Sequence, residues 1–523
     1  MNRIHQVLAG LLLLLAASGW PAPAAASPST SLCVNQGGTG GCLGSITAAI
    51  AAASNGDTIL IAGAATPYLE RLTINKSLNL TGDSAATTII DGGAIAQVIR
   101  ITASVTVTLS NLTIRNGQSG AGNLLDQWGG GIHADHANLT LNDSVVSGNH
   151  TGGAGGCCGG GGGGIYIGHG TLALNHTLVT GNTTGTPNAN SAGGGQGGPA
   201  GDGGGIYSDF SRLSLNFSTI SHNATGPGSH GDTLGGTGGY GGGLITVEGT
   251  VFLNNSAIVD NASGDGGSGG TTGGDGGLGG GIFNQASALT VHHSTIGNNV
   301  TGAGGTGGST RGASGSGAGL YARGPNAPAP RAINIETSTL SGNATGRGLA
   351  NGFGGDGGAI YSKNQDAITV TNSTLAWNTV DDDKIGGGIA NETSTVKLQN
   401  SLVVNNHQQS GPDAVHDCAG ALVSLGYNLM TEPDCTPAII ATTGDQFYVG
   451  GDIVWPLTNN GGPTLTNALK LGSPAIDASD NSTCLSTDQR GFARPVFGGA
   501  QLRCDIGAFE LYRFGLRLPL LMR

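Results

Sequence analysis

The stretch GGGIYSDFSRLSLNFSTISHN, residues 203–223, joins three glycines to an aliphatic residue, then alternates Leu213 and Leu215 with polar residues, and ends at Asn223. The chain contains eight copies of this sequence pattern. In six of them the closing asparagine follows the third position of the glycine box by 18 residues, as Asn223 follows Gly205. Alternation with period two is typical of strands. A fixed repeat of short strands predicts a solenoid in which each unit stacks on its neighbour.

Two columns of the repeat keep one kind of side chain throughout. The column after the glycines is always aliphatic: Ile132, Ile165, Ile206, Leu244, Ile282, Leu320, Ile360 and Ile389. A later column is always serine or threonine: Ser144, Thr177, Ser218, Ser256, Ser294, Ser338, Ser373 and Ser401. Strand pairing between successive units satisfies the backbone groups that each isolated strand leaves open. The sequence therefore predicts an all-β fold, a parallel β-helix.

The closing column is always asparagine, which tolerates left-handed turns and can bond both the backbone and a stacked copy of itself. We predict an internal ladder of amides at one turn. A ligand site is the weaker interpretation, because sites are local and this column spans the whole domain. The predicted ladder consists of Asn149, Asn182, Asn223, Asn261, Asn299, Asn343, Asn378 and Asn406.

The amino-acid composition and net charge of the chain limit the kinds of molecule that it can bind. The chain has 523 residues, 101 of them glycine, and a formal net charge of −12. No Gly-X-Y period runs through it, which excludes collagen, and the glycines gather in segments that we predict to be loops. The acidity argues against nucleic acid and anionic membranes as partners, since both need a basic face.

The beginning of the chain, residues 1–26, has the layout of a secretory signal peptide, with Arg3, an apolar run and an Ala-rich end. We expect the mature chain to be secreted or held at the cell surface. No later segment reaches the about 20 apolar residues that a membrane-spanning helix needs, so no transmembrane helix is expected.

Eight cysteines in an exported chain favour disulfides. The local pairings that we favour are Cys33 with Cys42, Cys418 with Cys435, and Cys484 with Cys504. The adjacent Cys157 and Cys158 lack the second cysteine pair or histidine cluster that a metal site would need. We expect neither a metal nor a cofactor.

The segment before the repeats, residues 45–93, contains a helix-like run followed by alternating strands. It resembles the N-terminal cap and first coils of pectin-lyase-like right-handed β-helix proteins, which implies a right-handed helix with a short capping helix. The GGAI box at Gly357–Ile360 and its GGGI relatives are similar to repeats of polymorphic outer membrane proteins, although aliphatic residues replace the phenylalanine of that family's second box. Residues 27–128 thus form the cap and first coils, and residues 129–410 the repeats.

The stretch NNGGPTLTNALKLGSPAIDASDNSTCLSTDQRGFARP, residues 459–495, and the later CDIGAFE, residues 504–510, resemble the choice-of-anchor Q domain of exported bacterial β-helix proteins. The resemblance implies a small C-terminal module over residues 411–510. The tail, residues 511–523, stands where such proteins carry a sorting segment.

An enzyme is the alternative to a scaffold, because this fold includes polysaccharide lyases and hydrolases. Asp209, Glu248 and His169 come from neighbouring repeats, four or five positions past the box, and Asp135 and His136 share this region. Paired carboxylates with a histidine suit acid/base chemistry on sugars. Solvated turn residues are the favoured interpretation, and no catalytic residue is expected.

Besides a scaffold and an enzyme, calcium binding by the glycine-rich segments is a third possible function. Asp202, Asp232, Asp265, Asp275 and Asp356 resemble the aspartates of RTX nonapeptides, but the aliphatic residue that completes that motif is missing after Asp275. We expect no calcium site.

The sequence favours a secreted or cell-surface structural or adhesion-like protein that presents an extended binding face. Glycans or components of the cell surface or matrix are the partners we expect. Tyr166, Tyr207 and Tyr361 share one column and predict a stripe of rings on the surface. The alternative is a polysaccharide lyase or glycoside hydrolase acting in a surface groove.

Overall fold

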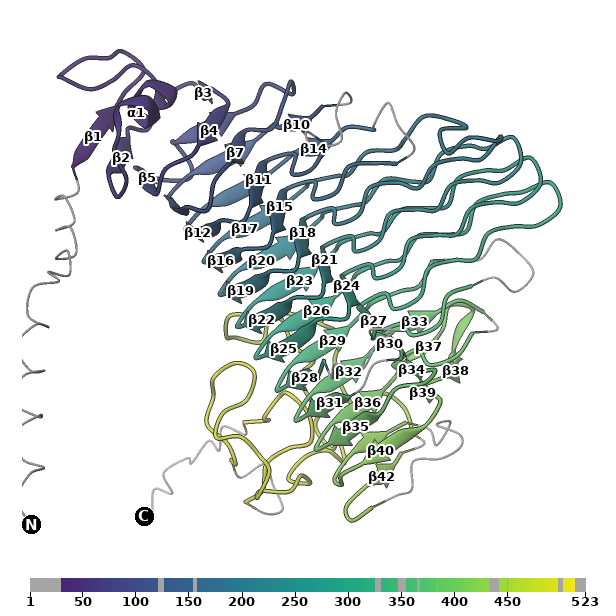
Figure 1. The fold of residues 1–523 in the computed structure, drawn as a ribbon. Helices are drawn as coiled ribbons and strands as arrows, with labels where there is room; N and C mark the ends of the chain where they lie inside the picture. Colours follow the sequence, from purple (N-terminus) through teal and green to yellow (C-terminus); the bar gives the residue numbers. More distant parts are fainter. Residues whose placement is uncertain are drawn as a thin grey trace, which may run out of the picture.

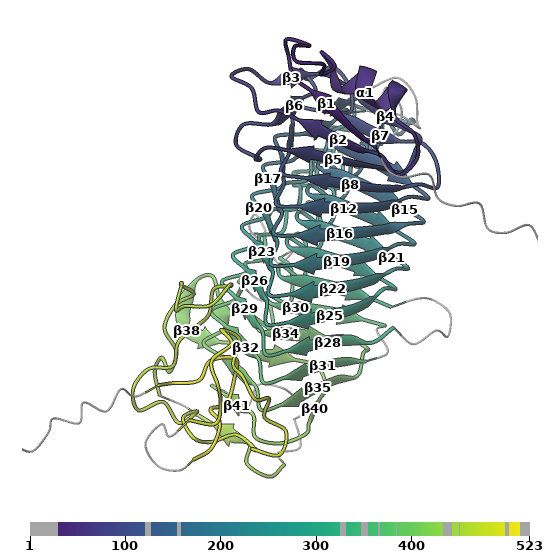
Figure 2. The same cartoon turned by 90° about the vertical axis from the view of Figure 1, so that its left-hand side faces the viewer.

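Three long sheets wrap around one core to form a right-handed parallel β-helix, as predicted (Figures 1 and 2). The computed structural model describes residues 30–120, 127–153, 158–324, 331–346, 354–364, 367–382, 384–431, 442–448, 450–496 and 502–512. Within each of the three sheets, every neighbouring pair of strands is parallel and joins one coil to the next, as β15 and β18 show with Ile165 opposite Ile206.

We name the three long sheets A, B and C. Along the chain, each repeat contributes a strand first to sheet C, then to sheet A and then to sheet B. Sheet A contains β1 (Ser31–Val34), β2 (Thr58–Ile61), β5 (Leu78–Gly82), β8 (Thr106–Ser110), β12 (Asn138–Asn142), β16 (Thr171–Asn175), β19 (Arg212–Asn216), β22 (Thr250–Asn254), β25 (Ala288–His292), β28 (Ile333–Glu336), β31 (Ile368–Thr371), β35 (Val396–Gln399) and β40 (Leu422–Ser424). Sheet B contains β3 (Tyr68–Leu69), β6 (Ile89–Asp91), β9 (Thr113–Arg115), β13 (Val145–Ser147), β17 (Leu178–Thr180), β20 (Thr219–Ser221), β23 (Ala257–Val259), β26 (Thr295–Gly297), β29 (Thr339–Ser341), β32 (Thr374–Ala376), β36 (Leu402–Val404), β41 (Leu429–Met430) and β42 (Gln446–Phe447).

Sheet C begins each repeat and carries the residue that follows the glycine box. It contains β4 (Leu72–Ile74), β7 (Ile99–Ile101), β11 (Ile132–Asp135), β15 (Ile165–Gly168), β18 (Ile206–Asp209), β21 (Leu244–Val247), β24 (Ile282–Gln285), β27 (Leu320–Arg323), β30 (Ile360–Lys363), β34 (Ile389–Asn391) and β39 (Cys418–Ala419). Two small sheets join β10 (Gln118–Ser119) to β14 (His150–Thr151), and β33 (Thr379–Val380), β37 (His407–Gln408) and β38 (Gly411–Val415) to one another.

The aliphatic columns predicted from the sequence form the core. Ile206 on β18, Leu213 and Leu215 on β19 and Ile220 on β20 are all fully buried. Their counterparts in the neighbouring coils stack directly above and below them, because the strand register pairs like positions. Burial of each such side chain contributes about 1.5–3 kcal/mol.

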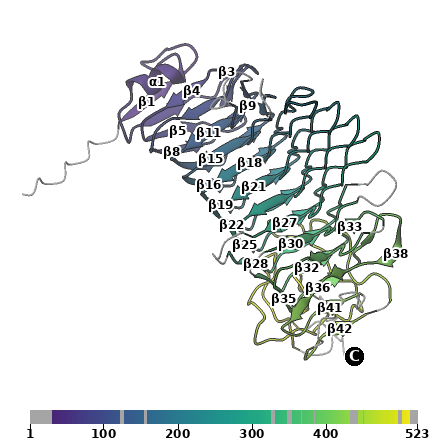
Figure 3. The same ribbon diagram turned by 45° about the vertical axis from the view of Figure 1, so that its right-hand side comes forward.

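The N-terminal end of the core is covered by a short helix, α1 (Ile46–Ala52), as predicted (Figure 3). Ser45 caps it by accepting a hydrogen bond from the backbone N–H of Ala48 at 3.1 Å. Ile46, Ala49 and Ile50 are buried, so the helix seals the first coil against solvent and protects the open end of the sheets.

One asparagine in each of eight consecutive coils joins a continuous ladder of hydrogen bonds inside the turn that follows sheet B. Each Nδ2 donates to the Oδ1 of the asparagine in the next coil at 2.8–3.0 Å, from Asn149 to Asn406. The backbone N–H of each asparagine donates to the same oxygen. The last amide, that of Asn406, donates to the buried carboxylate of Asp417 at 3.0 Å.

Three consecutive glycine-rich loops, residues 224–243, 262–281 and 300–319, stack in register beside the β-helix (Figures 1 and 3). Backbone bonds join one loop to the next, since Gly236 accepts from Gly267 and Gly274 accepts from Gly305. Bonds across each loop alternate with them, since Gly267 accepts from Gly274 and Gly305 accepts from Gly312. A Cβ at Gly274 would lie 1.9 Å from the carbonyl oxygen of Gly236. Glycine is required there for close backbone approach, as at the axis of collagen.

The C-terminal residues form a small module that packs along the outer face of sheet B (Figure 2). The backbone N–H of Ala508 donates to Thr374 Oγ1 at 3.0 Å, and that of Gly507 donates to the carbonyl of Asn400 at 2.9 Å. Inside the module, the buried Arg490 and Asp488 form an ion pair at 2.6 Å. Strands β39, β40 and β41, which lie past residue 410, still belong to the three sheets.

Two of the predicted disulfides are present, Cys33–Cys42 at the N-terminal end and Cys484–Cys504 in the C-terminal module. Cys418 is also disulfide-bonded, and Cys435, its predicted partner, lies outside the described residues. Residues 1–26 lie outside them as well, as does the tail beyond residue 512. Among the described residues, no helix combines the length and apolar character that crossing a bilayer requires.

We expect Asn261→Ala to lower the free energy of unfolding by about 1–3 kcal/mol. The N–H and Nδ2 of Asn223 both donate to Asn261 Oδ1 at 3.0 Å, and the substitution leaves these buried donors without an acceptor. Chemical denaturation monitored by circular dichroism measures the loss. Asn188→Ala, at an exposed loop position, is the control, and equal losses in the two variants would contradict a structural role of the ladder.

A second prediction concerns His293, at the junction with the C-terminal module. Burial lowers its pKa to about 4, and its neighbours His292 and Arg494 act in the same direction. A lowered histidine pKa means that the folded state prefers the neutral ring, so stability is complete above about pH 6.5 and falls as the pH drops toward 4. Denaturation at pH 7, 5.5 and 4.5 tests this.

We expect His293→Asn to reduce that acid sensitivity. The residue has a positive φ of 48°, and asparagine occupies the equivalent left-handed turn position in other coils, as at Asn255, with the same φ. His176→Asn is the matched control, because His176 stands at the same turn position but is exposed. An unchanged pH dependence in His293→Asn would refute the assignment.

Candidate functional site

The turn between sheet C and sheet A carries the predicted candidates. The strand register places Asp135 opposite Gly168, Gly168 opposite Asp209, and Asp209 opposite Val247. The residue after each has a left-handed backbone, with φ of 54° at His136, 49° at His169, 44° at Phe210 and 48° at Glu248. The residues therefore form two adjacent columns, one on the last strand position and one on the turn.

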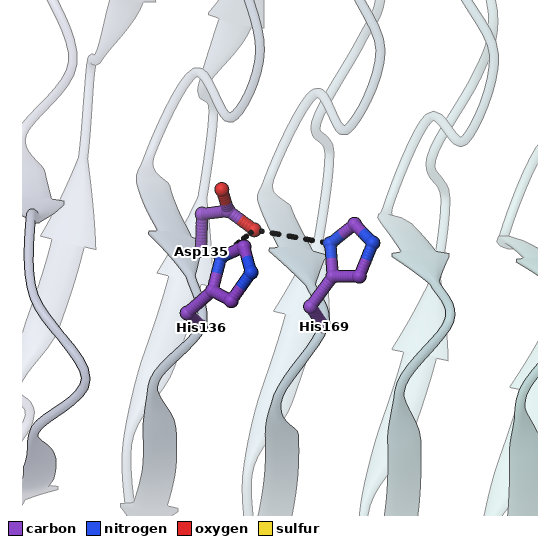
Figure 4. Close-up of side chains that lie close together, drawn as sticks. All are labelled: Asp135, His136 and His169. Carbon is purple, nitrogen blue, oxygen red and sulfur yellow. Dashed lines mark hydrogen bonds and ion pairs between the residues drawn. The ribbon is translucent and has the colours of Figure 1, made fainter.

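Three of these side chains meet in one cluster, Asp135, His136 and His169 (Figure 4). Asp135 Oδ1 lies 3.1 Å from His136 Nδ1 and 3.4 Å from His169 Nδ1. The two imidazole rings are nearly parallel, at 10°, with centroids 4.8 Å apart. Asp135 is half-buried and both histidines are exposed. The cluster therefore offers two imidazole nitrogens and a carboxylate to solvent.

Gly168 provides the room that the cluster occupies. It stands between Asp135 and Asp209 in the column, and a Cβ there would lie 2.6 Å from Asp135 Oδ1 and 2.8 Å from the hydroxyl of Tyr166. Any larger residue would push the Asp135 carboxylate away. Gly168 is an exception in its column, since the coils on either side carry Asp135 and Asp209 at this position.

Asp209 is a carboxylate of this turn whose pKa is shifted by its surroundings. Burial raises its pKa, the positive field of His169 opposes that shift, and the negative charges of Asp135 and Glu248 add to it. Burial also raises the pKa of Tyr166 to about 12, with further contributions from Asp209 and Asp135. Titratable groups from four consecutive coils thus influence one another on this turn.

Two surface hollows flank the cluster, and they separate the predicted acid/base set. The first, about 490 Å³, is lined by Asp135 and His136 together with Arg100, Trp128, His133 and Tyr166. These last four residues were not predicted from the sequence to share a site. The second, about 390 Å³, is lined by His169 and Glu248 with Phe210 and Arg212. Asp209 lines neither hollow, so Asp209, Glu248 and His169 do not share one cavity.

The tyrosines of the predicted stripe, Tyr166, Tyr207 and Tyr361, lie half-buried on the outer face of sheet C, and other rings of the same column are covered. In this column Tyr166 contacts Tyr207, and Phe283, Tyr321 and Tyr361 form a second stack. Ile245 stands between the two groups of rings. Phe283 and Tyr321 are buried, because bulky residues that precede the glycine boxes fold over them. Tyr240 stacks on Phe283 at 5.1 Å, and Trp128 meets Tyr207 at 4.9 Å.

That covering column could have been found in the sequence. Trp128, Tyr240 and Leu278 stand at the same position relative to their boxes, and this is a bulky column outside the strands. The stripe therefore serves mainly to attach the glycine-rich loops to sheet C. Trp128 and Tyr166, at its N-terminal end, line the larger hollow.

The aspartates of the glycine-rich loops make structural contacts. Asp202 accepts from the backbone N–H of Tyr240, Asp265 from Ala303 and Asp275 from Ala313, at 2.7–2.8 Å. Each bond joins one coil to the next. These carboxylates therefore satisfy backbone donors at the places where loop pairing leaves them open.

The fold defines the chain as a parallel β-helix protein. No protein family and no curated protein matches the sequence. Among solved structures, a chain described as pectate lyase Pel9A is similar over 92% of this chain and 97% of its own length, with 15% identity and a TM-score of 0.30.

Proposed function

We propose that the protein is a secreted or cell-surface scaffold of structural or adhesion type, which binds glycans or other surface components along the turn between sheets C and A. The observation that carries this proposal is the row of exposed rings His136, His169 and Phe210. They come from three consecutive coils, with centroids 4.8 and 5.4 Å apart. Hollows of about 490 and 390 Å³ flank the row.

The row suits an extended polar ligand because it combines aromatic surface with charged groups. Phe210 is 50% exposed and so presents the face of an apolar ring to solvent beside the imidazoles. Rings of this kind contact sugars, and carboxylates and imidazoles nearby bond their hydroxyl groups. The rigid coils hold these groups in place before a ligand arrives, which lowers the entropy cost of binding.

A polysaccharide lyase or glycoside hydrolase is the second candidate, and the raised pKa of Asp209 favours it. A carboxyl group whose pKa is raised by burial beside other carboxylates is a typical general acid. The separation of Asp209 from the hollow that His169 and Glu248 line weakens this candidate. We therefore rank the binding scaffold first.

Screening the purified chain on a glycan array, and then measuring Kd for the best ligand, tests the binding row. We expect Phe210→Ala to weaken binding roughly 2- to 10-fold, since an aromatic contact contributes about 0.5–1.5 kcal/mol. Phe217→Ala is a closely matched control. Phe217 is 48% exposed and stacks on His176 at 5.3 Å and 7°, as Phe210 stacks on His169 at 5.4 Å and 7°, but it lies on the turn between sheets A and B. Equal losses in both variants would remove the proposed face.

Incubation with a panel of polysaccharides separates the two candidate functions. We expect the unmodified protein to release no reducing ends and no unsaturated products. If cleavage does occur and Asp209→Ala with Glu248→Ala lowers the rate at least about a hundredfold, the enzyme replaces the scaffold as the proposed function. Circular dichroism of the double variant must match that of the parent chain.

A further inference from the structure

We propose that Asp135, His136 and His169 form a binding site for a divalent transition metal of the zinc class. This goes beyond the proposed binding function and beyond the sequence-based expectation of no metal. Imidazole nitrogen and carboxylate oxygen are the ligands that Zn²⁺ takes in proteins. The cluster supplies two nitrogens and one carboxylate from two neighbouring coils.

The separations within the cluster fit a shared ion. Bonds of about 2.1 Å at tetrahedral angles place two ligand atoms about 3.4 Å apart. Asp135 Oδ1 lies 3.1 Å from His136 Nδ1 and 3.4 Å from His169 Nδ1. The three donor atoms all lie within 4.8 Å of one another. Small side-chain movements therefore suffice to bring all three onto one ion.

The two rings must turn in order to bind. Their planes are nearly parallel in the structure, whereas a bound ion lies close to the plane of each imidazole that it contacts. The side chains of His136 and His169 are 60% and 47% exposed, so the turn gives up only the stacking of the two rings on each other and of His169 on Phe210. The backbone positions are fixed by the ladder between β11 and β15.

Local features confine the site to these two coils. Gly168 leaves the space that the Asp135 carboxylate occupies, and the left-handed backbone at His136 and His169 places both rings on the same ridge. The next positions of the ridge are Phe210 and Glu248, which end the run of imidazoles. Three protein ligands leave room for water or for an oxygen of a bound ligand, as in open zinc sites.

Isothermal titration of the untagged chain with Zn²⁺ tests the proposal. We expect one ion per chain, and at least about tenfold weaker binding in each of Asp135→Asn, His136→Ala and His169→Ala, the scale of loss seen even when a group that supports a metal ligand is removed. His222→Ala is the matched control. His222 is an exposed histidine that approaches a single carboxylate, Asp260, at 4.0 Å, and its loss should leave the affinity unchanged.

A second variant tests the geometry without removing a ligand. Gly168→Ala should also weaken Zn²⁺ binding, because the new Cβ displaces the Asp135 carboxylate, while circular dichroism checks that the fold is retained. A tenfold excess of Ca²⁺ should not compete, since calcium prefers sites made of oxygen ligands. Absence of binding, unchanged affinity in the three ligand variants, or equal competition by Ca²⁺ would overturn the proposal. None of these outcomes depends on whether the chain binds glycans.

Discussion

The hydrogen-bonded asparagine ladder imposes one constraint on the eight coils that it joins, from Asn149 to Asn406. Each Oδ1 accepts two N–H groups from the preceding coil, for example from the backbone and Nδ2 of Asn182 at Asn223. These groups are buried, and a buried donor without an acceptor costs about 1–3 kcal/mol. The segment from the glycine box to the asparagine must therefore keep its length or bulge away from the core. Most insertions fall instead in the loop that follows the asparagine.

The same constraint explains why the glycine-rich loops are ordered. Once the coils are stacked in register, loops of equal length emerge in register as well, and the loops that begin after Asn223, Asn261 and Asn299 are spaced by 38 residues each. Their backbones come close enough to bond directly, and only glycine fits between them. High glycine content here reflects close packing of backbone, whereas in an isolated loop it would indicate flexibility.

The repeat pattern was sufficient to predict the sheets and the core columns. Both follow from local spacing and from the need of stacked strands to pair like with like. The capping helix was implied by the resemblance of residues 45–93 to other β-helix caps, and two disulfides by the number and proximity of the cysteines. The bulky column before the boxes is visible in the sequence, but the path of the glycine-rich loops was not predicted, because it depends on contacts between coils such as that of Tyr240 with Phe283. The sequence therefore predicted the column of rings on sheet C, but not the extent to which residues of the loops cover it.

The candidate site shows a related limit. Spacing placed Asp135, His136 and His169 near one turn, but it could not show that two imidazoles converge on one carboxylate. That convergence depends on the positive φ at both histidines and on the missing side chain at Gly168.

A regular solenoid repeats the same environment in every coil, so a local site requires a departure from the repeat. Gly168 is such a departure, since it replaces the aspartate found at this position in the coils on either side. Without it, three carboxylates would stand in one column about 4.8 Å apart and repel one another. With it, the Asp135 carboxylate can turn into the open space and meet the two histidines. Gly168, which breaks the repeat, is thus the residue that allows these titratable groups to meet.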